Sequence, residues 1–298
     1  MNFTYKQIWL INFPVMMSLL MEQLINLTDT IFLGHVGEVE LGASALAGMY
    51  YIAIYMLGFG FSLGLQVMIA RRNGEGNLQK TGETFWQGMF FLITLSILTF
   101  TFSKLFSPTL LRTVISSDQI YLAVIQYISW RDYSFLSVFP ILAYRAFYVG
   151  TTKTRVLTIN SILLVTTNTL LNYLLIFGVG GFPRLGMAGA AIASSVAEAV
   201  ALIYLVTYTY FKVDKKKYGW RCSFNFPLLR QMFQLSSWTM IRSFFCIAPW
   251  FLFFIAIEHL GERQLAAGNV VRSVSVILFV IVNSFATTGI SLVSNLIG

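Results

Sequence analysis

The sequence has few charged residues and almost no cysteine. Charged residues make up 11% of the 298 positions, whereas about 25% is usual in a soluble domain. The two cysteines, Cys222 in a basic segment and Cys246 in an apolar run, exclude a disulfide framework and a cysteine metal site. The chain also lacks a glycine-rich phosphate loop with a lysine and a His-Glu-x-x-His motif. The sequence therefore predicts no enzyme, no metal site and no organic cofactor.

Apolar residues dominate instead, at 57% of the chain with a mean hydropathy of +0.73. They form continuous runs without alternation, which predicts helices and not strands. A helix needs about 20 such residues to cross a bilayer. We therefore predict an all-α polytopic membrane protein, surrounded by membrane lipids, with eight spans. These are expected at about 8–33, 46–70, 85–106, 120–149, 156–177, 186–211, 228–257 and 265–296.

Basic residues gather in alternate loops between these spans. They precede the first span and follow the second, fourth and sixth, as Lys6, Arg71, Arg72, Lys80, Lys153, Arg155 and the run 212–221. Since loops rich in lysine and arginine remain on the cytoplasmic side, we predict a cytoplasmic N-terminus. The net charge of +8 is explained by this orientation, so no nucleic-acid partner is predicted.

Two loops share a sequence pattern. The segment GHVGEVELGASAL at 34–46 resembles EHLGERQLAAGNV at 258–270. Five identities occur at one offset of 224 positions, in which His35, Gly37, Glu38, Leu41 and Ala43 recur as His259, Gly261, Glu262, Leu265 and Ala267. The pattern indicates an internal repeat. Because six spans separate the copies, both would cross the membrane in the same direction.

The repeat predicts two unequal parts. We expect residues 1–211 to form an N-lobe of six transmembrane helices and 212–227 to form a basic cytoplasmic linker. Residues 228–298 would supply the first two helices of a parallel-repeat second lobe. A complete second copy would need about four more helices after Gly298. The chain is therefore expected to be a fragment of a two-lobed protein or a natural truncation.

A few acidic and amide side chains interrupt the apolar runs. Glu22 and Asp29 are seven residues apart and lie on nearly the same face of the first span. An acid costs about 2.5–3.5 kcal/mol at the centre of a membrane helix, so its presence suggests a function. Asp29 precedes Gly34 by five residues, about 7–8 Å from the outer end, and Asn168 and Asn172 lie at a similar depth in the fifth span. A carboxylate beside two amides can hold a proton or a small cation.

Structural explanations of these side chains stay open. Asp29 can be solvated by headgroups near its helix end, and Glu22 can pair with Arg145. Glu198, an acid in the sixth span, can cap a packed Ser/Thr interface instead of lining a site. Arg131 is adjacent to Asp132, so the two side chains should point apart. Arg131 is then expected to contact another helix or the outer interface.

Small residues and prolines mark expected contacts and bends. Gly60 and Gly64 have the four-residue spacing of close helix packing, as do Gly189, Ala193 and Ala197, which follow Gly186. Pro140 and Pro249 lie inside the fourth and seventh spans, where proline can kink a helix.

Three stretches resemble the multidrug and toxic compound extrusion (MATE) family. They are LTDTIFLGHVGEVELGA at 27–43, TNTLLNYLLIFGVGGFPRLGMAGAAIAS at 167–194 and IEHLGERQLAAGNVVRS at 257–273. The resemblance covers the whole chain, and the middle stretch is the most specific. It implies twelve helices in two bundles of six around a central cavity, in the cell inner membrane. It also implies export of amphipathic, often cationic, drug-like compounds in antiport with H+ or Na+, without an obligate protein partner.

The resemblance assigns roles to residues of this chain. Asp29 falls on the family's ion-coupling aspartate of span one, and Arg131 and Arg145 fall on basic positions of span four. Two positions depart from the pattern. Asn172 stands where some members have an aspartate in span five, and Cys246 stands near a glutamate position in span seven. Coupling through the first lobe alone is therefore the simpler expectation.

Three other functions remain as alternatives. A lipid-linked saccharide flippase of related architecture would need a strongly basic cavity, whereas the spans hold only scattered arginines. A polytopic membrane enzyme would need clustered histidines or acids, and the chain has only two histidines. The third alternative is an inactive truncated fragment without a closed pathway. If the chain is a transporter, the absence of an ATP-binding motif predicts that an ion gradient drives it.

Overall fold

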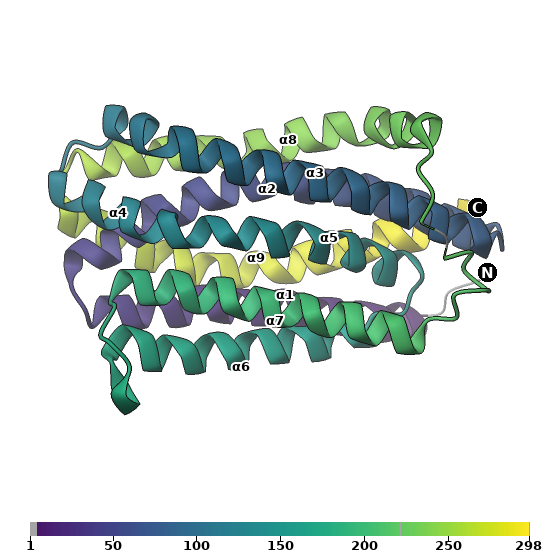
Figure 1. The fold of residues 1–298 in the computed structure, drawn as a ribbon, viewed down its shortest axis with the longest axis horizontal. Helices are drawn as coiled ribbons and strands as arrows, with labels where there is room; N and C mark the ends of the chain where they lie inside the picture. Colours follow the sequence, from purple (N-terminus) through teal and green to yellow (C-terminus); the bar gives the residue numbers. More distant parts are fainter. Residues whose placement is uncertain (1–4, 221, 298) are drawn as a thin grey trace.

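The computed structural model describes residues 5–220 and 222–297, and every regular element in these ranges is helical. Long helices run along one common axis and are joined by loops at both ends of the bundle (Figure 1). The elements are α1 (Tyr5–Gly34), α2 (Glu38–Gly74), α3 (Leu78–Val114), α4 (Asp118–Arg131), η1 (Asp132–Ser134), α5 (Phe135–Gly150), α6 (Arg155–Phe177), η2 (Val179–Gly181), α7 (Met187–Lys212), α8 (Phe226–Glu258) and α9 (Glu262–Ile297). The predicted all-α membrane class is confirmed.

Among the residues that the structure describes, seven helices are long and apolar enough to cross a membrane. The fourth predicted span, at 120–149, differs from the prediction of one continuous helix. It is divided into α4 and α5 by the 3-10 turn η1. Pro140 lies six residues farther on, inside α5, so the interruption is not at the proline. The turn instead coincides with Arg131, Asp132 and Ser134, whose side chains bond to other helices.

Helix α2 lies at the centre of the bundle and approaches α8 closely at two glycines. A Cβ on Gly60 would lie 2.5 Å from the Cα of Met240, and one on Gly64 would lie 2.0 Å from Oγ of Ser236. Apolar side chains gain little by leaving lipid, so membrane helices associate mainly through close packing of this kind. The packing predicted for Gly60 and Gly64 is confirmed.

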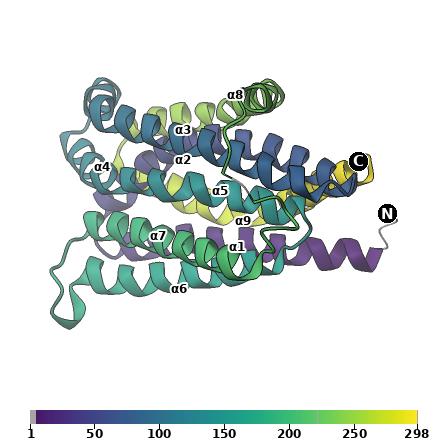
Figure 2. The ribbon, with the colours of Figure 1, turned by 45° about the vertical axis from the view of Figure 1, so that its right-hand side comes forward.

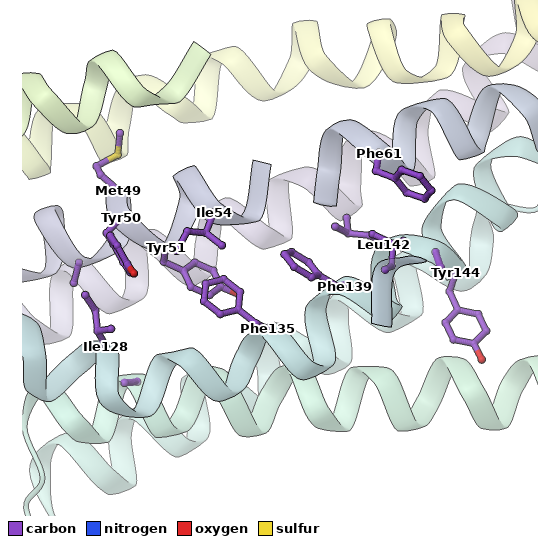
Figure 3. Close-up of a cluster of buried hydrophobic side chains, with 14 of the residues drawn as sticks. Met49, Tyr50, Tyr51, Ile54, Phe61, Ile128, Phe135, Phe139, Leu142 and Tyr144 are labelled. Atoms are coloured by element: carbon purple, nitrogen blue, oxygen red, sulfur yellow. The ribbon is translucent and has the colours of Figure 1, made fainter. Parts of the chain in front are cut away.

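Aromatic side chains fill the space between α2 and α5 (Figure 3). The rings of Tyr51 and Phe135 stack with centroids 4.8 Å apart, and Phe139 follows at 5.8 Å from Phe135. Gly58 makes room for Phe139, because a Cβ at this position would lie 2.7 Å from the ring. This contact fixes the start of α5, and therefore η1, against α2.

The two repeat loops have matching local structures. His35 Nδ1 lies 2.8 Å from the carbonyl oxygen four residues earlier, and His259 Nδ1 lies 2.9 Å from its counterpart. The next helix begins in each case with an amide bonded to the loop glycine's carbonyl oxygen, at 3.1 Å for Gly37 and 3.2 Å for Gly261. The sequence pattern thus corresponds to one loop geometry used twice.

Helices α8 and α9 are joined to the first part of the chain near both ends of the bundle. At one end, Asn269 donates to the carbonyl oxygen of Leu41 over 3.1 Å and to Ser44 over 3.0 Å. At the other end, Asn73 donates to Asn295 over 2.8 Å. Helices α8 and α9, which the sequence pattern predicts to be the counterparts of α1 and α2, therefore pack against these helices.

Candidate functional site

The hairpin of α6 and α7 lies beside α1 in both views of the fold (Figures 1 and 2). Gly178 ends α6 in the left-handed conformation, with φ of 72°, and so turns the chain back at low steric cost. Gly189 brings α7 close to α6, since a Cβ there would lie 2.7 Å from the carbonyl oxygen of Leu175. The glycine-rich motif between the helices thus sets one face of α6 against one face of α7.

Asp29 of α1 and three side chains from α6 and α7 form a closed ring of hydrogen bonds. Asn172 of α6 donates to Asp29 Oδ1 over 2.5 Å and to Asn168 Oδ1 over 3.0 Å. Asn168 donates to Ser194 of α7 over 3.0 Å, and Ser194 donates to Asp29 Oδ2 over 3.4 Å. Both oxygens of the carboxyl group are therefore occupied by neutral donors.

The three neutral members of the ring are shielded from solvent, and Asp29 itself is partly buried. Asn168 and Asn172 are 0% exposed and Ser194 is 3% exposed. Asn172 makes both of its bonds through the amide nitrogen, and its oxygen Oδ1 is buried without a hydrogen-bond partner. A buried acceptor without a donor is costly, and an oxygen atom is also the ligand that a hard cation such as Na+ prefers. The carboxylate, the amide oxygens and the serine hydroxyl are thus suited to bind a proton or a small cation.

A second polar cluster lies one turn farther along α7. Arg131 of α4 donates to Glu198 over 2.8 Å, and Tyr51 of α2 donates to the other oxygen of Glu198 over 3.4 Å. The guanidinium carbon of Arg131 lies 4.2 Å from the centre of the Tyr51 ring, and Arg131 also donates to Ser134 over 2.8 Å. The prediction that Arg131 contacts another helix is confirmed.

Asp132 points away from this cluster, as expected from its adjacency to Arg131. It accepts a hydrogen bond from Ser103 of α3 over 2.7 Å, and Lys104 Nζ lies 3.8 Å from its second oxygen. The 3-10 turn therefore directs two adjacent charges toward two different neighbours, α7 and α3.

The structure brings together three of the five predicted site residues, Asp29, Asn168 and Asn172. It places Glu198 in the adjacent ion pair. The Glu22 backbone belongs to α1, but its side chain lies outside the described part of the structure. Sequence reasoning missed Ser194 in the ring and the Arg131–Glu198 pair. The four-residue spacing of Ser194 and Glu198 on one helix face was the available signal.

Comparison with known proteins places this arrangement in a family. The model of the MatE family matches residues 14–174, more than half of the chain. The chain belongs to the MatE family. The matched segment includes Asp29, Asn168 and Asn172, whereas Ser194 and Glu198 lie beyond it.

Relatives of this MatE chain carry the name "Probable multidrug resistance protein NorM". The protein from Agrobacterium fabrum is 24% identical over 281 residues, which are 93% of this chain and 60% of the relative. The protein from Neisseria meningitidis serogroup A is 26% identical over 284 residues, covering 93% of this chain and 61% of the relative. The chain thus spans about three-fifths of the length of these relatives.

Solved structures of MATE transporters share the fold. The chain described as the "Outward-facing conformation of a multidrug resistance MATE family transporter of the MOP superfamily" superposes with a TM-score of 0.81 at 19% identity, covering 94% of this chain and 62% of that one. The eukaryotic MATE transporter AtDTX14 gives a TM-score of 0.78 at 19% identity, covering 97% and 64%. The MatE chain is therefore a multi-pass membrane protein with the fold of these transporters.

Proposed function

We propose that this protein takes part in the export of amphipathic, cationic compounds in antiport with H+ or Na+. The ring around Asp29 is the observation that carries this proposal. It combines one carboxyl group with two amides and a hydroxyl group, and it joins α1 to the α6–α7 hairpin. The names of the relatives support drug-like compounds as the substrate class.

The proposed coupling acts through the charge of Asp29. A proton or Na+ arriving from outside neutralises the carboxylate and changes its bonds to Asn172 and Ser194. Helix α1 then repacks against α6 and α7, and the substrate is released outward. The cation shifts this equilibrium only by the difference in its affinity for the two arrangements of the helices.

The proposal includes the placement of the protein. We place it in the cell inner membrane with a cytoplasmic N-terminus, in accord with the basic loops. Residues 1–211 act as the N-lobe that binds the cation, and 228–298 belong to a second lobe related by a parallel repeat. No organic cofactor and no obligate protein partner enter this scheme.

Gradient-driven dye transport in proteoliposomes tests the proposal. Ethidium, a cationic amphipathic dye, is loaded and its export is followed under an imposed H+ or Na+ gradient. Asp29→Asn is expected to abolish the response to either gradient, because the amide cannot change charge. Asp118→Asn is the control, since Asp118 is an exposed acid paired with Arg112 over 2.5 Å at the helix end. Gradient-coupled efflux that persists in Asp29→Asn would refute the mechanism.

A further inference from the structure

The Arg131–Glu198 pair lies next to the Asp29 ring and has no part in the coupling step described above. Ser194, which donates to Asp29, and Glu198 are four residues apart on α7, so their side chains project from the same face about 5–6 Å apart. Arg131 and Glu198 each keep only 13% of their side-chain surface exposed. Two opposite charges are thus buried within one helical turn of the proposed cation site.

The pair joins α4 to α7, and residues of α2 and η1 also hold it. Tyr51 of α2 covers the guanidinium group and donates to Glu198. Ser134 of η1 accepts from Arg131 and bonds to Ser195 of α7 over 3.0 Å. Surface ion pairs lack such support, and burying an ion pair carries a desolvation cost that partners of this kind only partly offset. The arrangement therefore needs an explanation beyond stability.

The charges near Asp29 supply that explanation. The charged groups near Asp29 are Arg131 of α4 and Glu198 of α7, which bond to each other one turn along α7 from Ser194. Tyr127 of α4 is a neutral titratable neighbour, and α6 contributes the neutral amides of Asn168 and Asn172. If Arg131 stood alone, it would be the counter-ion of Asp29 and would leave no charge for a cation to neutralise. With Glu198 ionised, the three groups sum to one negative charge.

We propose that Glu198 is a specificity-determining residue that retains Arg131, so that the Asp29 site keeps one net negative charge and accepts one monovalent cation. This inference rests on the proposed function and adds a requirement for the net charge of the site, which we call the charge rule. Asn172 fits the rule, because an aspartate at this position would raise the charge to two. Glu198 and Arg131 are positioning groups, since neither donates to nor accepts from Asp29 in the described hydrogen bonds.

Carbodiimide labelling of Asp29 tests the rule without a transport assay. Dicyclohexylcarbodiimide reacts with protonated carboxyl groups in apolar surroundings, and mass spectrometry resolves the modified residue. The protein is purified in detergent and labelled at mildly acidic pH, with and without NaCl. In Glu198→Gln, Arg131 is free to hold Asp29 ionised, so labelling of Asp29 should slow by about 10- to 100-fold. The double variant Arg131→Gln/Glu198→Gln should return to within about threefold of the wild-type rate.

Two further variants separate charge from folding. Asp132→Asn removes another buried acid beside Arg131 in sequence, but one bonded to Ser103, so it should leave the labelling of Asp29 unchanged. In Arg131→Gln alone, Asp29 should be labelled at least as fast as in the wild type. This variant tests the charge rule if Glu198→Gln fails to fold. A slower rate in Arg131→Gln would contradict the rule.

The outcomes distinguish this inference from the proposed function. Wild-type labelling in Glu198→Gln, or a double variant as slow as Glu198→Gln, overturns the charge rule and leaves cation binding at Asp29 intact. A wild-type Asp29 that neither reacts nor responds to NaCl overturns the proposed function, and the charge rule with it.

Discussion

Asp29 depends on side chains of two other helices for its environment. Its oxygens accept from Asn172 of α6 and Ser194 of α7, and Asn168 closes the ring. A change at one of these neutral partners should therefore alter the affinity of the carboxyl group for a cation without altering the formal charge of the site.

Asn172→Ala should slow gradient-driven ethidium efflux. It removes a hydrogen bond to a charged group, worth about 1.5–3 kcal/mol, which corresponds to about a 10- to 100-fold change in ion affinity. For Na+ the half-saturating concentration should rise, because the alanine also removes the oxygen Oδ1. The measurement is the efflux rate in proteoliposomes against the concentration of H+ or Na+.

Asn160→Ala provides the matched control. Asn160 is also a buried amide of α6, at 7% exposure, with an Oδ1 that lacks a hydrogen-bond partner, but it lies two turns or more from the ring. Its half-saturating ion concentration should stay within about twofold of wild type. Equal behaviour of the two variants would remove the support for a site at Asn172.

The sequence predicted which residues belong to the site better than it predicted their hydrogen-bond partners. Helical depth alone placed Asp29 level with Asn168 and Asn172. It did not predict Ser194 or the partner of Arg131, because those contacts depend on how far α7 rotates against α4 and α6. The four-residue spacing of Ser194 and Glu198 places both on one face of α7, but it does not identify the residues on other helices that this face contacts.

Among the elements, α2 and α8 form a contact that only glycine permits. The Cβ of an alanine at position 60 would lie 2.5 Å from the Met240 Cα and 2.7 Å from the Thr239 carbonyl oxygen, and backbone atoms cannot yield as a side chain can. Close packing at this point sets the separation of the two helices.

Gly60→Ala should lower the thermal midpoint of the detergent-purified protein. Overpacking costs about 1–3 kcal/mol, which corresponds to about 2–10 °C for a chain of this size. Gly48→Ala on the same helix is the control, since a Cβ there meets no atom within 4 Å. Its midpoint should be unchanged or higher, as alanine favours helix over glycine. An equal loss in both variants would mean that helix propensity, and not the α2–α8 contact, determines the result.

The position of each helix followed from hydropathy, whereas the interruption of the fourth did not. Continuous apolar residues on both sides of Arg131 and Asp132 predicted one span. The 3-10 turn arises because Arg131 bonds to α7 and Asp132 to α3, and such tertiary contacts are not encoded in local hydropathy. Pro140, the expected kink, is accommodated inside α5.

For the whole molecule, the basic loops predict the orientation in the membrane. The linker that precedes α8 holds Cys222, a free and exposed cysteine, while the other free cysteine, Cys246, lies within α8. The two native thiols thus report on a loop and on a membrane-spanning segment.

A membrane-impermeant maleimide should label Cys222 only after the cells are opened. In intact cells the cytoplasmic linker is protected, and Cys246 inside the apolar span should react poorly in both states. Phe182→Cys, an exposed position between α6 and α7 in the connection at the opposite end of the bundle (Figure 1), should be labelled in intact cells. Labelling of Cys222 before opening would reverse the proposed orientation.

The repeat connects the sequence to the architecture at this largest scale. The offset between His35 and His259 predicted two equivalent loops, and the structure gives them the same hydrogen bonds. The chain spans about three-fifths of its relatives, so the two-lobed assembly and its transport cycle are proposals that build on this local correspondence.

The central claim is that Asp29 takes up and releases a cation inside the membrane. Infrared difference spectroscopy of the reconstituted protein measures this directly, because a protonated carboxyl group has a C=O stretching band that a carboxylate lacks. The account predicts a band at mildly acidic pH that is lost at alkaline pH or on addition of Na+, and that is absent from Asp29→Asn. A wild-type spectrum identical to that of Asp29→Asn under all these conditions would show that Asp29 does not change its protonation state and would contradict the account.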